Sequence, residues 1–141
     1  MGNRAIINLQ KTSTSWDSET PSVEKAPFSI YLHWNGGKES VYAFYNATYD
    51  FFMQDGGIDF SYFQARFLQV IGHFFGGTSS LGVLPYTTQS HGDNGVYTID
   101  VDSELPRLEH EQYVGIYNQC MEYLQSTTYQ ARKTARAKAQ A

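Results

Sequence analysis

Cysteine is almost absent from this chain, since Cys120 is the only one among 141 residues. A single cysteine can form neither an intrachain disulfide nor a thiolate metal cluster. Long apolar runs are also missing. None approaches the roughly 18 residues of a membrane span, and no basic start leads into the apolar segment of a secretion signal. These absences exclude a disulfide-stapled secreted module and predict a cytoplasmic protein that does not enter a membrane.

Basic residues are scarce, with 10 Lys and Arg against 14 Asp and Glu, and their distribution is uneven. Four of them lie among the last ten residues, so residues 1–131 hold six basic and fourteen acidic residues, a net charge of −8. An acidic body disfavours direct nucleic-acid binding and suits a partner with a basic surface. Ordinary solubilising charge explains the same excess. The four basic residues of the tail are Arg132, Lys133, Arg136 and Lys138.

The tail at 131–141 has two interpretations. Its cations could contact nucleic acid or a membrane surface. Without aromatic or large apolar residues between them, however, a solvated helix end is favoured.

Aromatic residues are abundant, at 16% of the chain, with 11 Tyr, 9 Phe and 2 Trp. This is more than a small core needs to enclose, and exposed Tyr and Trp are favoured anchors of protein–protein interfaces. We therefore expect Trp34 to contact a partner. Trp16 lies in a polar, Ser/Thr-rich stretch, where it either folds back onto the body or is exposed for a partner.

The apolar spacing predicts four strands and three helices in the order ββααββα. This order favours the α+β class: an antiparallel sheet of about four strands with two or three amphipathic helices packed on one face. Residues 1–130 form a single domain in this scheme, with 11–26 as a mobile loop. The predicted strands are 4–9, 28–34, 81–84 and 96–100, and the helices are 38–53, 59–75 and one from near Leu108.

Two kinds of local signal mark the ends of these elements. Asp59 or Ser61 is placed to cap the second helix, and Gly76 follows its last apolar residue. The pair Asn94-Gly95 is a strong hairpin signal, so we expect strands 81–84 and 96–100 to pair with each other.

Residues 35–40, Asn-Gly-Gly-Lys-Glu-Ser, join a predicted strand to a predicted helix, as phosphate-binding loops do. The stretch resembles the Ser-Gly-Gly-x-Asp-Ser pyrophosphate loop of the ATP-pyrophosphatase family, with Glu39 at the Asp position. The resemblance implies that a nucleotide contacts Asn35, Gly36, Gly37, Lys38 and Ser40. The alternative is a plain corner in which the two glycines supply a positive φ and Glu39 complements the helix dipole.

Members of that family carry a larger parallel α/β domain, which the element order here does not match. No Gly-x-Ser-x-Gly motif is present either. We therefore predict no catalytic residue and no cofactor, and nucleotide or anion binding at 35–40 is the second hypothesis.

Acidic residues recur from the predicted hairpin to the start of the last helix. A spaced row of carboxylates can imitate a phosphate backbone and compete for the basic groove of a nucleic-acid-binding protein, although a solvated acidic face is the plainer interpretation. His91 with the nearest of these carboxylates could also hold a divalent metal, but nothing in the spacing defines a geometry, so no metal is predicted. The row comprises Asp93, Asp100, Asp102, Glu104, Glu109 and Glu111.

Four stretches together resemble a family of small uncharacterised proteins carried by phages, prophages and conjugative elements. They are Met-Gly-Asn-Arg-Ala-Ile, Tyr-Leu-His-Trp-Asn-Gly-Gly, Gln-Val-Ile-Gly-His-Phe-Phe-Gly-Gly and Asp-Asn-Gly-Val-Tyr, and the match covers most of residues 1–100. The resemblance implies a genomic setting. Because small accessory proteins of such elements often bind and block a host defence component, as anti-CRISPR proteins do, our leading hypothesis is a non-enzymatic inhibitor that docks through its exposed aromatic and acidic residues. The expected partner is a host protein or nucleoprotein complex in the host cytoplasm, with homo-oligomerisation left open.

Overall fold

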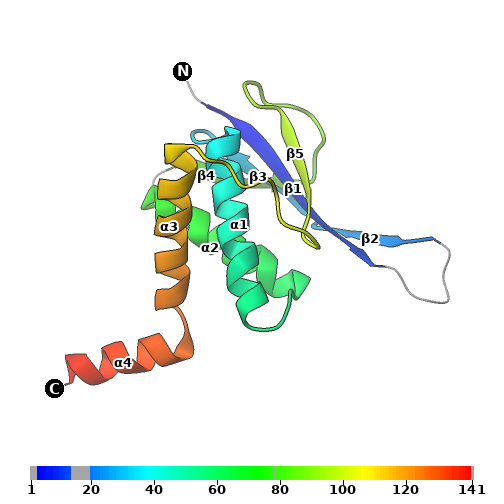
Figure 1. Cartoon of the computed structure of the whole chain (residues 1–141). Helices are drawn as coiled ribbons and strands as arrows, with labels where there is room; N and C mark the ends of the chain where they lie inside the picture. The colour runs from blue at the N-terminus through cyan, green and yellow to red at the C-terminus, as the bar shows by residue number, and fades with distance from the viewer. Residues whose placement is uncertain (1–2, 14–19, 78, 141) are drawn as a thin grey trace.

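The computed structural model describes residues 3–13, 20–77 and 79–140 as a mainly antiparallel sheet with helices on one side (Figure 1). The predicted α+β class is confirmed, with two elements more than expected, β2 and α4. The strands are β1 (Ala5–Ser13), β2 (Ser22–Lys25), β3 (Phe28–Leu32), β4 (Leu81–Pro85) and β5 (Val96–Asp100). The helices are α1 (Lys38–Gln54), α2 (Phe60–Phe75), α3 (Glu111–Ser126) and α4 (Tyr129–Ala139).

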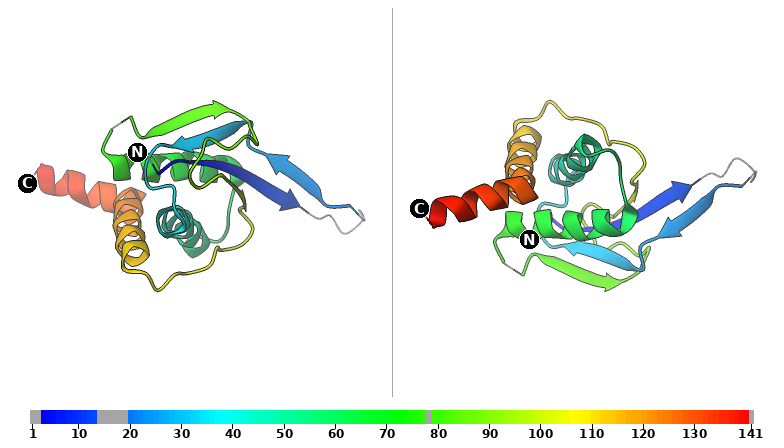
Figure 2. Two further views of the ribbon diagram at one scale, coloured as in Figure 1. Left: turned by 90° about the horizontal axis from the view of Figure 1, so that it is seen from above. Right: turned by 90° about the horizontal axis from the view of Figure 1, so that it is seen from below.

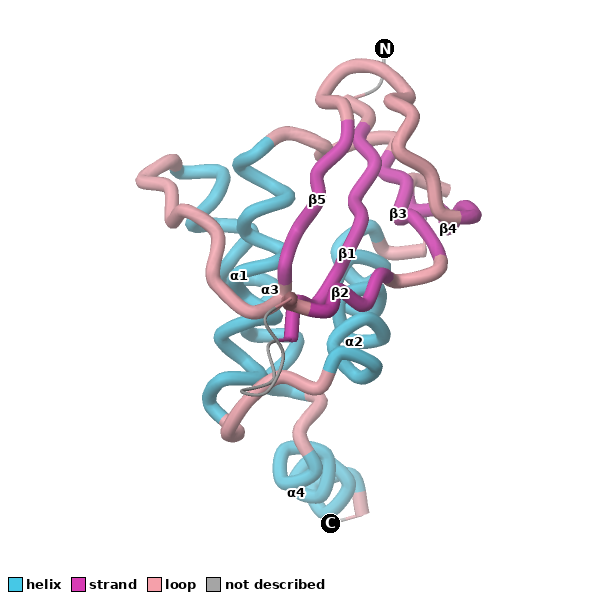
Figure 3. Tube along the Cα trace, turned by 90° about the vertical axis from the view of Figure 1, so that its right-hand side faces the viewer, coloured by secondary structure: helices cyan, strands magenta, loops and turns pink. Residues whose placement is uncertain are grey.

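β1 is the central strand of the sheet. Its first half pairs antiparallel with β3, and β3 pairs antiparallel with β4. On its other edge β1 pairs parallel with β5, from Ile6 opposite Val96 to Gln10 opposite Asp100. Figure 3 shows the resulting order β5, β1, β3 and β4 across the sheet.

The predicted hairpin between β4 and β5 is therefore wrong, because these strands lie on opposite sides of β1. Residues 86–95 cross the face of the sheet instead, and the buried side chains of Asn8 and Ser29 hold them there by hydrogen bonds with Thr87. Asn94-Gly95 still forms a turn, but it turns against the start of β1, where Ile6 N donates to Gly95 O at 3.0 Å. A local turn signal does not say which strand the chain will pair with next.

The predicted mobile loop at 11–26 is also partly wrong. β1 continues to Ser13 and pairs with β2, from Gln10 opposite Lys25 to Ser13 opposite Ser22, and this ribbon extends away from the body (Figure 2). Its polar residues lack the alternation that marks a half-buried strand, because the whole of β2 is exposed. Trp16 lies outside the described residues.

The core is an aromatic layer between the sheet and the helices. Ile7 and Leu9 of β1 pack against α1 and α2, whose buried faces contribute Phe44, Phe63 and Phe67. The predicted ends of α2 are confirmed: Asp59 Oδ1 accepts from Ser61 N and Tyr62 N, and Gly76 closes the helix with φ of 66°.

α3 begins at Glu111, later than predicted, and a bend at Thr127–Thr128 separates it from α4. α4 points away from the rest of the molecule (Figure 1). Among the described helices, none combines the length and the hydropathy needed to cross a bilayer.

Candidate functional site

The corner between β3 and α1 contains Trp34 and the predicted ligand loop. Asn35, with φ of 59°, makes the left-handed turn that we expected from the glycines, and Gly37 has φ of −74°. Gly36 is needed for a different reason, namely close packing. A Cβ atom there would lie 2.6 Å from Asn3 O and 2.8 Å from Ala5 Cβ, so the backbone of this corner lies directly on the start of β1.

The polar groups of residues 35–40 are largely used within the protein. Ser40 is 1% exposed, and its hydroxyl accepts from Asn35 Nδ2 at 3.1 Å and from Gln112 Nε2 at 3.4 Å. Gly36 N donates to Asn3 O, and Gly36 O accepts from the Tyr97 hydroxyl at 2.8 Å. Glu39 lies in the first turn of α1, where its carboxylate complements the helix dipole. Of residues 35–40, only Lys38 is exposed.

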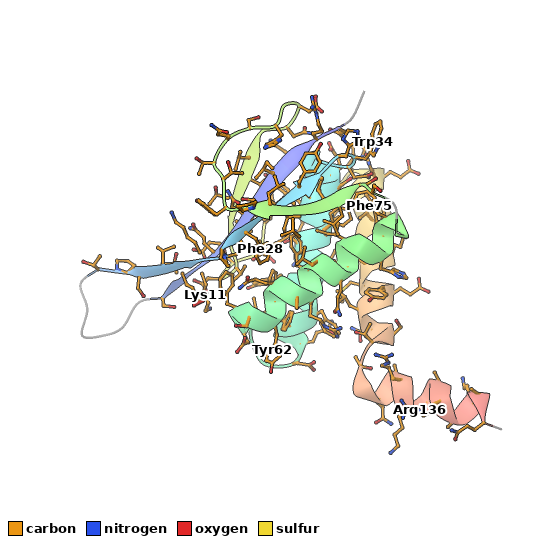
Figure 4. The ribbon with its side chains drawn as sticks, turned by 180° about the vertical axis from the view of Figure 1, so that it is seen from behind. Lys11, Phe28, Trp34, Tyr62, Phe75 and Arg136 are labelled. Carbon is orange, nitrogen blue, oxygen red and sulfur yellow. The ribbon has the colours of Figure 1, made fainter. Side chains whose placement is uncertain are left out.

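Trp34 stands beside this corner with 44% of its surface exposed (Figure 4). His33 supports it edge-on, with ring centroids 5.2 Å apart, and the Tyr31 hydroxyl lies 3.0 Å from His33 Nδ1. Tyr31 also contacts the ring of His91, which reaches it from the crossing segment 86–95. Rings from two distant parts of the sequence therefore form the base of an exposed tryptophan.

Asp93 lies close to the same corner and anchors the turn before β5. Its carboxylate accepts from Arg4 N at 2.8 Å and from Arg4 Nε at 3.2 Å. These bonds, first the one from the Arg4 backbone, hold the pKa of Asp93 below its usual value. The structure thus places Asp93 near Trp34 but pairs its charge with an arginine.

The other predicted acidic residues do not form one continuous row. Asp100 and Asp102 lie at the far end of β5, where Thr12 Oγ1 donates to Asp100 and Lys11 Nζ lies 2.7 Å from Asp102 Oδ1. Asp93 and Asp100 are therefore at opposite ends of one strand, and no cluster of metal-binding side chains occurs in the described part of the chain.

The remaining acidic residues lie on the way to α3 and at its start. Glu104 pairs with Arg107 at 2.7 Å. Glu109 and Glu111 are exposed, and no ion pair among the described residues involves either of them. They lie near the Trp34 corner, because Gln112 of α3 reaches Ser40 of α1.

A set of polar residues on α1 was not expected from the sequence. Tyr45 and Asn46 are fully buried and bond to backbone groups of residues 100–105, and Asp50 forms a two-pronged ion pair with Arg107 at 2.7 and 2.9 Å. Together they attach the extended segment 101–110 to α1, which explains why α3 starts late. In the sequence, the only sign of this role is that polar residues interrupt the apolar stripe of the helix.

Asp50 should make folding stability sensitive to acid. Burial by itself would raise the pKa of its carboxyl, but hydrogen bonds from Arg107 and Tyr117 outweigh it and lower the pKa. A lowered pKa in the folded state contributes stability above the unfolded-state pKa of about 4, and this contribution is lost as pH falls through the folded-state value.

We therefore expect Asp50→Asn to cost about 1 kcal/mol at pH 7 and progressively less towards pH 2. Urea titrations at several pH values measure the difference. Asp55→Asn, at the exposed end of the same helix, is the control and should show no such trend. An equal cost for Asp50→Asn at pH 7 and pH 2 would contradict the assignment.

A second exposed aromatic residue, Tyr62, borders a groove of about 520 Å³ between the end of α1, α2 and the bend before α4. Tyr62 is 70% exposed, and Arg66 crosses the groove to donate to Thr127 Oγ1 at 2.6 Å. Trp34 and Tyr62 lie far apart on the molecule (Figure 4), so each can serve as a control for the other. The chain matches no protein-family profile, no curated protein and no solved structure.

Proposed function

We propose that this protein is a non-enzymatic accessory protein of a phage or mobile element, which binds and inhibits a host defence component in the host cytoplasm. The observation that carries the proposal is Trp34, which is 44% exposed on a corner tied down on both sides. Exposed tryptophans are enriched among the residues that dominate binding free energy at protein interfaces.

The corner is already ordered before any partner arrives. Asn3 N donates to His33 O at 2.9 Å, and Gly36 N donates to Asn3 O at 2.8 Å, so the residues on both sides of Trp34 are fixed to the chain segment before β1. Since little conformational freedom remains to be lost on docking, more of the contact energy appears as affinity. This order suits Trp34 to the role of an anchor.

The charge around the anchor favours a basic partner surface. Glu39 lies five residues after Trp34, and Glu109 and Glu111 stand at the neighbouring start of α3, with no ion pair to either among the described residues. Carboxylates at the rim of an interface steer a basic partner and make association sensitive to salt. Asp100, Asp102 and Glu104 contribute less to this attraction. They lie farther along the chain from Trp34, and each is bound to a group of the same molecule.

The test is restoration of phage infection in bacteria that each carry one active defence system. The wild-type protein is expected to block one system and raise plaquing, Trp34→Ala to lose this effect, and Tyr62→Ala to keep it. With the purified target, Trp34→Ala should weaken binding about 30-fold, equivalent to about 2 kcal/mol. Failure of the wild type against every system, or full activity of Trp34→Ala, would remove the proposal.

Nucleotide binding by Asn35–Ser40 has less support than protein docking. The hydroxyl of Ser40 and the peptide groups of Gly36 already have partners within the protein, and the carboxylate of Glu39 shares the helix start that an anion would occupy. An entering phosphate would have to displace or repel these groups.

A further inference from the structure

Among the described elements, α4 stands out because all of its charged side chains are basic. Every residue from Arg132 to Gln140 is exposed, and the helix stands at the opposite end of the molecule from Trp34 (Figure 4). The bend that leads into it is held by Arg66 on Thr127 and capped by Thr128 Oγ1, which accepts from Ala131 N at 3.1 Å. The helix is therefore attached firmly at its start and open along its length.

The charges of α4 have a single sign. No Asp or Glu occurs from residue 123 to the last residue, whereas Arg132, Lys133 and Arg136 fall within about 100° of one face of the helix. Like charges four residues apart, as at Arg132 and Arg136, destabilise a helix in water. A solvated surface helix ordinarily mixes both signs, so this face is suited to an external anion.

A second copy of the chain is a weaker source of that anion than its acidic composition suggests. Four of its acidic residues are already neutralised within their own chain. Nor does the helix fit a membrane, since the uncharged residues between Arg132 and Ala139 are alanines and one threonine, and none is a large apolar residue of the kind that enters the interface. The neutralised carboxylates are Asp50, Asp93, Asp102 and Glu104.

We infer that α4 binds the phosphate backbone of duplex DNA, without regard to base sequence. Arg132 and Arg136 are about 6 Å apart along the helix axis, close to the roughly 7 Å between alternate phosphates along a strand. The alanines keep the helix slender, and the major groove of DNA, about 12 Å wide, admits an α-helix. Long side chains that could read bases are lacking between Arg132 and Ala139, apart from the cations themselves.

The experiment is fluorescence anisotropy of a labelled 20-base-pair DNA duplex titrated with the full chain. Three phosphate contacts predict an affinity that falls about 40-fold between 50 and 200 mM salt. The double variant Arg132→Ala/Arg136→Ala should weaken binding about tenfold at 50 mM salt. Lys25→Ala/Lys38→Ala removes the same charge from the body and should change the affinity less than about twofold.

Helix content by circular dichroism confirms that each variant is folded. Trp34→Ala should bind DNA as the wild type does, which separates this inference from the proposed docking at Trp34. The inference fails if the duplex is not bound at 50 mM salt, or if the two double variants weaken binding equally. It also fails if labelled poly-L-glutamate is bound as tightly as DNA, because an acidic protein would then be the better partner.

Discussion

Replacing Asn46 with alanine is expected to lower the free energy of unfolding by about 3 kcal/mol. The Asn46 side chain is fully buried and makes three hydrogen bonds, donating to Leu105 O at 3.0 Å and Tyr113 Oη at 2.9 Å and accepting from Leu105 N at 2.9 Å. Its removal leaves three polar groups without partners in a region where, among the described residues, every buried polar side chain has one.

Urea denaturation with an unchanged m-value measures this cost. Asn118→Ala, at an exposed position on α3, is the matched control and should stay within about 0.5 kcal/mol of the wild type. Tyr113→Phe removes only one of the three bonds and should cost about 1 kcal/mol. Hydrogen exchange should also show faster opening of residues 101–110 in Asn46→Ala, and slow exchange there would contradict the role of Asn46.

Gly36→Ala is expected to be the second most damaging change, at about 2–3 kcal/mol. The new methyl group would lie 2.6 Å from Asn3 O and 2.9 Å from Arg4 C, which are backbone atoms and cannot swing aside as a side chain can. Relief of this clash requires the corner to move, and movement weakens the bonds of Gly36 with Asn3 and Tyr97.

Gly37→Ala is the matched control for this prediction. A Cβ atom at Gly37 would lie 3.1 Å from Glu39 Oε2, the end of a flexible side chain, and at an ordinary contact distance of 3.8 Å from Asn3 Nδ2, so the cost should stay below about 1 kcal/mol. Thermal shift with millimolar ATP separates the two roles of the loop. Stabilisation of the wild type by ATP, lost in Gly37→Ala, would support nucleotide binding and contradict the packing role as the main reason for these glycines.

Local patterns were enough to predict the class and most element ends. The apolar stripes of α1 and α2 show a period that only a helix satisfies, and the Asp59 cap and Gly76 depend on backbone groups within a few residues. Local patterns predicted only part of the candidate site. Trp34 could be proposed from the excess of aromatic residues, but its neighbours, His33, His91 and the start of α3, come from separate segments.

By itself, the sequence determined the α+β class, helices α1 and α2 and the caps of α2, because these depend on interactions within one or two turns of chain. Only the tertiary structure decided that β5 pairs parallel with β1, that polar residues of α1 hold segment 101–110, and that α4 separates from α3. Each of these depends on which distant groups remain unpaired once the core has formed. The same reason explains why three carboxylates of the predicted row, Asp93, Asp102 and Glu104, became internal ion pairs, whereas Glu109, Glu111 and the cations of α4 stay exposed.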